Sequence, residues 1–200
     1  MFLVILLVVG ITVFFTVRWV HKQVETYTAT SPVALPRSNM DDADYANVEE
    51  RITQFTKALN QGQPTAPLVL NEQELNAFIE RTHPNDLGKE VYVVLDGNQV
   101  KGEVSFPLDN FKMSWLKGRY LNGNVTLDVS LQNRLLVVTA QQIEVNGVQV
   151  PDSYMQGFRT KNLAEKATED PKNAATIAKF DSIQVQDGKL IIKAEAQPAP

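Results

Sequence analysis

The chain begins with an apolar run that is longer than any other in the sequence. Sixteen of the first 20 residues are hydrophobic, and Arg18 is the first charged side chain. A helix from Met1 to Val17 would be about 25 Å long, near the lower limit for crossing a hydrocarbon core about 30 Å thick. Arg18 and Trp19 are residue types that favour the lipid headgroup region. We therefore expect residues 1–20 to form a transmembrane anchor.

This apolar run has an alternative interpretation as a cleaved signal peptide, and its orientation in a membrane also has two alternatives. A cleaved signal peptide is the alternative to an anchor, although such peptides have an apolar core of about 7 to 15 residues and an A-x-A site, which does not follow closely here. Arg18 and Lys22 lie after the run, so the positive-inside rule would keep the C-terminal side in the cytoplasm. Two basic residues are a weak bias, and the composition of the remaining chain favours an extracytoplasmic domain. We expect a single-pass membrane protein with that topology.

Helical patterns follow a stretch that has no apolar periodicity. Residues 21–44 are rich in Thr, Ser and Pro, which is typical of a flexible linker. Apolar residues then recur at three- and four-residue spacing, which predicts an amphipathic helix through Tyr45, Val48, Ile52, Phe55 and Leu59. After a short strand at 68–70, Asn71 and Glu74 have the spacing of a capping box and predict a second helix. We place the folded domain at residues 45–196.

Most of the remaining pattern is typical of antiparallel strands. Apolar residues alternate with polar ones from Leu121 to Leu131, which predicts a strand with one buried face. Asx-Gly pairs at 96–97, 146–147 and 187–188 favour tight hairpin turns between alternating runs. Two strands would each be about 40 Å long if fully extended, and long strands twist. We predict an α+β fold in which a long, curved antiparallel sheet has helices packed on one face.

Composition and motifs exclude several classes of chemistry. The chain has no cysteine and therefore no disulfide scaffold, thiolate metal site or thiol nucleophile. His21 and His83 lie far apart in the sequence, and we interpret His83 as a helix-capping residue rather than as a general base. The sequence contains no nucleophile elbow, no glycine-rich phosphate loop and no metal-ligand motif. We therefore predict a protein that is not an enzyme and that has no metal and no cofactor.

The charge balance excludes a further class of partner. Residues 23–200 contain 17 of the 19 basic side chains and all 23 acidic ones, which gives this part of the chain a net charge of −6. Because nucleic-acid binding needs a basic face, we predict no nucleic-acid partner.

Basic and aromatic side chains gather just before the strongest strand pattern, at Lys112, Trp115, Lys117, Arg119 and Tyr120. These five residues, here called the rim, would suit a lipid headgroup, a membrane phosphate or a partner protein. The alternative is that Arg119 pairs with a local carboxylate while Trp115 packs in the core.

Several short segments resemble one protein family. They are Leu68-x-Leu-Asn-x-x-Glu-Leu-Asn, Ser105-Phe-Pro-Leu, Gly118-Arg-Tyr-Leu-Asn-Gly, Val145-Asn-Gly-Val-Gln-Val-Pro and Asp187-Gly-Lys-Leu. The family consists of uncharacterised bacterial proteins with one N-terminal membrane helix and an extracytoplasmic α+β domain, and the resemblance covers residues 65–194. More distantly, the capped helix followed by long hairpins is similar to YpmS-like and LmeA-like envelope proteins. That similarity implies an elongated sheet that holds lipids.

These observations lead to two hypotheses about function. In the first, the chain is a membrane-anchored, non-catalytic envelope protein that binds a lipid or another apolar ligand in a curved sheet. In the second, it is an interaction scaffold for an envelope protein complex, and its core is filled by its own side chains.

Overall fold

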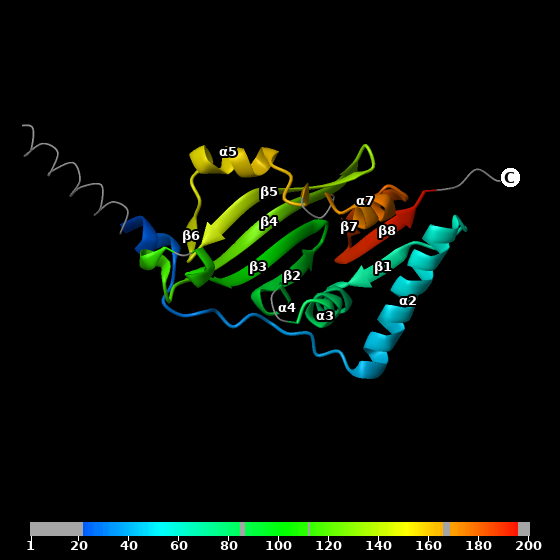
Figure 1. Cartoon of the computed structure of the whole chain (residues 1–200), viewed down its shortest axis with the longest axis horizontal. Coiled ribbons are helices and arrows are strands. Elements are labelled where there is room, and N and C mark those ends of the chain that lie inside the picture. Colours follow the sequence, from blue (N-terminus) through cyan, green and yellow to red (C-terminus); the bar gives the residue numbers. More distant parts are fainter. Residues whose placement is uncertain (1–21, 85–86, 112, 166–168, 196–200) are drawn as a thin grey trace, which may run out of the picture.

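The computed structural model describes residues 22–84, 87–111, 113–165 and 169–195, which form an α+β fold (Figure 1). The helices are α2 (Asp42–Gln61), α3 (Glu72–Thr82), α4 (Leu87–Glu90), α5 (Asp152–Thr160) and α7 (Pro171–Ile177). The strands are β1 (Leu68–Asn71), β2 (Val91–Asp96), β3 (Gln99–Pro107), β4 (Tyr120–Gln132), β5 (Leu135–Val145), β6 (Val148–Gln149), β7 (Phe180–Gln186) and β8 (Lys189–Ala194). Short 3-10 helices η1 (Leu108–Phe111) and η2 (Ser114–Leu116) connect β3 to β4. The predicted α+β class is confirmed.

The strands are divided between two antiparallel sheets, whereas the prediction had one long sheet. Strands β2 to β6 form a five-stranded meander in sequence order, and a second sheet has the order β1-β8-β7. Leu68 pairs with Ile192 and Leu70 with Leu190 in the β1–β8 ladder, which brings apolar residues from the two ends of the domain together. Local alternation of polar and apolar residues does not indicate such a distant partner, so the prediction of a single sheet was wrong.

The amphipathic helix predicted near the start of the domain is confirmed as α2. Asp41 caps its N-terminus by accepting a hydrogen bond from the Asp44 amide, and Gly62 ends it in the left-handed conformation at φ 65°. The predicted apolar stripe packs on the three-stranded sheet and contributes Val48, Phe55 and Leu59 to the core. This helix begins at Asp42, inside the range that the sequence assigned to the linker.

The turns between strands follow the predicted Asx-Gly pairs, with one addition. Gly97, Gly147 and Gly188 all have a positive φ, as the tight turns of hairpins require. The turn between β4 and β5 contains no glycine; Asn133 and Arg134 adopt the left-handed conformation there, at φ 52° and 64°.

Helices contact the five-stranded sheet near its edges. Helices α3 and α4 pack against β2, and α5 and α7 pack against β5. The central strand β4 has other strands as its principal neighbours, namely β3, β5 and β7. Its apolar side chains are consequently less enclosed than those of a sheet with a full helical layer.

The expected transmembrane anchor, residues 1–20, lies outside the described residues. In the part of the chain that the structure does describe, no helix is long and apolar enough to span a bilayer.

Candidate functional site

The structure places the described rim residues on the connection between β3 and β4. Trp115 belongs to η2 and is 53% exposed, and Lys117 is exposed just after it. Arg119 and Tyr120 are half-buried where β4 begins. Lys112 lies outside the described residues. The rim therefore contains two exposed side chains and two that take part in packing.

The guanidinium group of Arg119 holds the chain that leads into the domain. It donates hydrogen bonds to the Thr28 hydroxyl, to the Thr28 carbonyl at 3.0 Å and to the Val24 carbonyl at 3.5 Å. Residues 22–27 are helical, so Arg119 lies at the C-terminal end of that helix, where carbonyl groups favour a cation. The alternative that Arg119 pairs with a carboxylate and that Trp115 packs in the core is not what the structure shows.

Residues 28–38, here called the strap, run along the domain and are bound to it by polar contacts (Figure 1). Ala29 and Tyr120 exchange two backbone hydrogen bonds of 2.8 Å, which form an isolated antiparallel bridge. The Asn122 side chain donates to the Ser31 carbonyl at 2.9 Å and accepts from the Val33 amide at 3.2 Å. The Ser105 hydroxyl donates to Asn122 at 2.8 Å and completes the cluster. Much of the segment that we expected to be a linker is thus hydrogen-bonded to the sheet.

Sequence reasoning missed this polar cluster. Thr28, Ser105 and Asn122 are each 7% exposed, although alternation placed Ser105 and Asn122 on the solvated face of their strands. They are buried because the strap covers that part of the face. A signal was present in the sequence: two prolines, Pro32 and Pro36, favour an extended conformation that can lie across strands.

The opposite face of the five-stranded sheet is apolar over several strands. The β-ladders align Leu127 with Val100 and Ala140, and these paired positions share one face. Most of its apolar side chains are half-buried rather than buried: Val100, Val104, Phe106, Leu121, Val125, Leu127, Val129, Leu131, Leu136, Val138 and Ile143. We call this set the apolar face. A hollow of about 570 Å³ on the sheet is lined mainly by polar residues, including Gln99, Lys101 and Asp128, together with Leu127.

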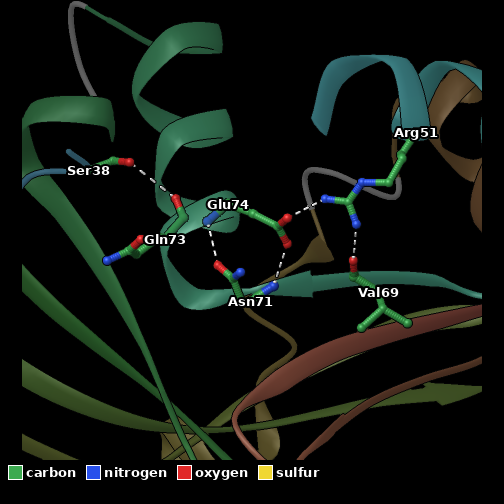
Figure 2. A network of polar contacts seen from close by, with 6 residues as sticks. All are labelled: Ser38, Arg51, Val69, Asn71, Gln73 and Glu74. Atoms are coloured by element: carbon green, nitrogen blue, oxygen red, sulfur yellow. Dashed lines mark hydrogen bonds and ion pairs between the residues drawn. The ribbon is translucent and has the colours of Figure 1, made fainter. Parts of the chain in front are cut away.

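The segment that carried the family resemblance forms a capping network that links helices α2 and α3 (Figure 2). Asn71 accepts a hydrogen bond from the Glu74 amide at 2.9 Å, and the Glu74 carboxylate accepts one from the Asn71 amide at 2.9 Å. Glu74 also forms an ion pair with Arg51, whose guanidinium donates to the Val69 carbonyl at 2.9 Å. On the other side of α3, the Ser38 hydroxyl donates to the Gln73 carbonyl at 3.3 Å. The predicted capping box is confirmed, and its role is structural.

Two further residues of the same segment join α3 to strand β2. Asn76 is 1% exposed; its amide group donates to the Val93 carbonyl at 2.7 Å and its side-chain oxygen accepts from the Val93 amide at 2.8 Å. Glu72 accepts a hydrogen bond from the Tyr92 hydroxyl at 2.8 Å and another from the Leu95 amide at 3.0 Å. Burial, and next the hydrogen bond to Glu72, raise the pKa of Tyr92 to about 12. These side chains form hydrogen bonds with backbone groups at the outer edge of β2, as a neighbouring strand would.

The remaining candidates for chemistry are isolated. His83 is the exposed C-terminal cap residue of α3, as expected, and its Nδ1 lies 3.0 Å from the Thr82 hydroxyl. Within the described residues, no group of three or more His, Asp or Glu side chains is arranged to hold a metal ion.

Comparison with known proteins completes the description of the site. The sequence matches no family model, and no curated protein or solved structure is significantly similar to it.

Proposed function

We propose that this chain is a membrane-anchored, non-catalytic envelope protein that binds a lipid or a similar apolar ligand on the apolar face of its five-stranded sheet. The membrane attachment is residues 1–20, and the domain lies on the extracytoplasmic side. The net charge of −6 over residues 23–200 makes a nucleic-acid partner unfavourable.

The observation that carries this proposal is the incomplete burial of the apolar face. Valine, leucine and isoleucine side chains of a sheet are ordinarily covered by a second layer, because each Å² of exposed apolar surface costs about 25 cal/mol. Here the central strand β4 has strands for its principal neighbours, and Val125, Leu127 and Val129 remain half-buried. An acyl chain lying along β4 would cover them and remove that surface from water. The resemblance of the capped helix and long hairpins to YpmS-like and LmeA-like envelope proteins, noted from the sequence, implies the same type of ligand.

Native mass spectrometry of the full chain, extracted with a mild detergent, tests the proposal. We expect a population of molecules that carries one additional mass in the range of a membrane lipid. Extracts that contain only the mass of the protein, over a range of gentle detergents, would contradict lipid binding.

A matched pair of substitutions locates the ligand. Leu127→Gln places a polar group on the apolar face, whereas Thr126→Gln changes the adjacent residue on the opposite face of β4. We expect Leu127→Gln to lower the lipid-bound fraction several-fold and Thr126→Gln to leave it unchanged. Circular dichroism shows whether both variants retain the fold. Equal loss in the two variants would place the lipid elsewhere.

A scaffold for an envelope protein complex is the second candidate function, and helix α5 favours it. Tyr154 and Phe158 are 61% and 41% exposed, and their four-residue spacing places them on one side of the helix. Aromatic side chains of this kind are enriched in protein interfaces. A photoreactive residue at Tyr154 would crosslink a defined partner in intact membranes if this function holds. The same photoreactive residue placed at Glu165 is the control and should give no protein product. Crosslinking of residue 154 to lipid alone would contradict the scaffold function.

A further inference from the structure

Three apolar side chains are exposed together on the loop between β3 and β4. Phe111, Met113 and Trp115 are 61%, 47% and 53% exposed, and they lie within five consecutive residues. Two hydrogen bonds close the base of the loop: the Leu108 amide donates to the Arg119 carbonyl at 2.8 Å, and the Gly118 amide donates to Asp109 at 3.0 Å. A loop that is fixed at its base yet presents apolar side chains to solvent is typical of an interaction surface.

The base of this loop is bound to the residues that directly follow the N-terminal apolar run. Arg119 donates to the carbonyls of Val24 and Thr28, and Figure 1 shows the loop beside the helix of residues 22–27, at one end of the molecule. Val24 is seven residues beyond Val17, the last residue of the apolar run. Even fully extended, seven residues span at most about 25 Å. If the run lies in a bilayer, the loop is held close to the bilayer surface.

The chemistry of the loop matches the boundary between lipid and water. Tryptophan is enriched at the headgroup level, and Met and Phe can enter the acyl boundary below it. Lys117 is exposed on the same loop. Cations at this depth are attracted to anionic headgroups by about 1 kcal/mol each. This composition favours a bilayer as the occupant over a protein, whose interface would be depleted in lysine.

We propose that the loop of residues 108–119 is a second membrane contact. Phe111, Met113 and Trp115 enter the headgroup region, Lys117 faces lipid phosphates, and Arg119 joins the loop to the chain that leaves the anchor. The domain is thereby held in one orientation on the membrane. The proposal shares membrane attachment through residues 1–20 with the proposed function, but it does not depend on a ligand bound to the apolar face.

The depth of Trp115 in a bilayer tests this directly. Trp115 is the only tryptophan besides Trp19, so Trp19→Phe leaves a single tryptophan in the full chain, which can be excited selectively. The variant is reconstituted in vesicles of phosphatidylcholine and phosphatidylglycerol, a fraction of which carries bromine at shallow or deep positions of the acyl chain. We expect blue-shifted emission and strong quenching by the shallow bromine atoms. Emission typical of water, with no quenching in vesicles to which the chain is bound, would overturn the proposal.

A tryptophan at the far end of the domain is the matched control. Leu135 is 52% exposed and begins β5, beside the turn at the opposite end of β4 from Tyr120. The 13 residues of β4 separate these ends by about 40 Å. We expect Leu135→Trp, combined with Trp19→Phe and Trp115→Phe, to remain unquenched. Quenching equal to that of Trp115 would show that bromine does not distinguish the two ends and would remove the support for docking.

A second variant tests the other apolar side chains. Phe111→Ser together with Met113→Ser changes only exposed side chains, so the fold measured by circular dichroism is expected to persist. Quenching of Trp115 should fall several-fold, and unchanged quenching would contradict insertion of the loop. Flotation with vesicles separates the two proposals: a chain that fails to float lacks the anchor on which both depend. A chain that floats with an unquenched Trp115 contradicts the loop contact alone.

Discussion

The hydroxyl group of Tyr92 gives the domain a dependence on alkaline pH. The pKa of Tyr92 is raised to about 12 by burial and by the hydrogen bond to Glu72, whereas an unfolded tyrosine ionises near 10.0. Below pH 10 the phenol is neutral in both states. Between pH 10 and 12 the unfolded chain is stabilised by ionisation while the folded chain keeps the proton, so the free energy of unfolding decreases.

We expect Tyr92→Phe to remove this part of the pH dependence. Urea unfolding of the wild-type chain should show a steeper loss of stability between pH 10 and 12 than unfolding of the variant. Absorbance of tyrosinate at alkaline pH provides an independent measurement, because Tyr92 should ionise about two pH units above the ordinary value for a tyrosine. Identical stability profiles for the two chains would contradict this assignment.

Asn76 satisfies two backbone groups of β2 with one side chain. Asn76→Ala would leave the amide and carbonyl of Val93 without their partner in a buried site, at a cost of about 2 to 3 kcal/mol. The measurement is urea unfolding of the detergent-solubilised chain followed by circular dichroism. Asn124→Ala is the control, since Asn124 is exposed on β4 and its removal should change stability by less than about 0.5 kcal/mol. Equal effects would show that the Val93 contacts contribute nothing.

The asparagines also show which residue roles could be predicted from the sequence. Asn71 was predicted as a helix cap because its partner, Glu74, lies three residues away and the spacing itself carries the signal. Asn76 and Asn122 bind backbone groups 17 and 91 residues away, so no local pattern identifies those contacts. Arg119 was predicted as a residue of interest for its charge, but its partners on residues 24–28 were not.

At the scale of elements, the capping network of α3 couples that helix to α2. One carboxylate oxygen of Glu74 accepts a hydrogen bond from the Asn71 amide, and the other accepts one from Arg51 of α2, as Figure 2 shows. Loss of an N-cap costs about 1 kcal/mol. Glu74 keeps its bond to the backbone amide of residue 71, but loss of the side-chain cap loosens the first turn of α3, which holds this carboxylate against Arg51. The contact between the two helices is therefore weakened as well.

We therefore expect Asn71→Ala to lower the free energy of unfolding by about 1 to 2 kcal/mol. Asn71→Ser keeps a side-chain acceptor at the cap and should retain most of the stability. Urea titration of the three chains provides the comparison. If Asn71→Ser is as unstable as Asn71→Ala, the effect does not come from the cap.

The helices and hairpins were predicted more accurately than the way in which they combine. Helix α2 and the hairpins arise from apolar spacing and turn residues that are adjacent in the chain, as at Gly97 and Gly188. The division into two sheets depends on the pairing of β1 with β8, and the burial of Asn122 depends on a strap from before the domain. Those outcomes are set by long-range packing, which a pattern of local alternation does not encode.

For the whole molecule, the strap determines how the domain is attached to the N-terminal segment. A flexible linker over residues 21–44 would let the domain rotate freely with respect to a membrane. The contacts of Arg119, Tyr120 and Asn122 instead fix the chain at residues 24–33, so only the few residues before Val24 separate the apolar run from the domain. If the apolar run lies in a bilayer, as proposed, the exposed loop beside that attachment point meets the bilayer in one orientation, because a short connection restricts both distance and direction.

Asn122→Ala tests whether the strap is held as the structure indicates. The substitution removes one of the two acceptors of the Val33 amide, which also donates to the Ser105 hydroxyl oxygen at 3.2 Å, and it removes the donor to the Ser31 carbonyl. The Ser105 hydroxyl loses the acceptor of its own proton. A loss of about 1 to 2 kcal/mol corresponds to a five- to thirtyfold increase in the population of open states. Hydrogen exchange of the Val33 amide should accelerate by that factor, whereas exchange in α2 should be unchanged because the core around Phe55 is separate from the strap. Unaltered exchange at Val33 would show that Asn122 does not hold the strap, and acceleration throughout α2 would show that the variant loosens the whole fold.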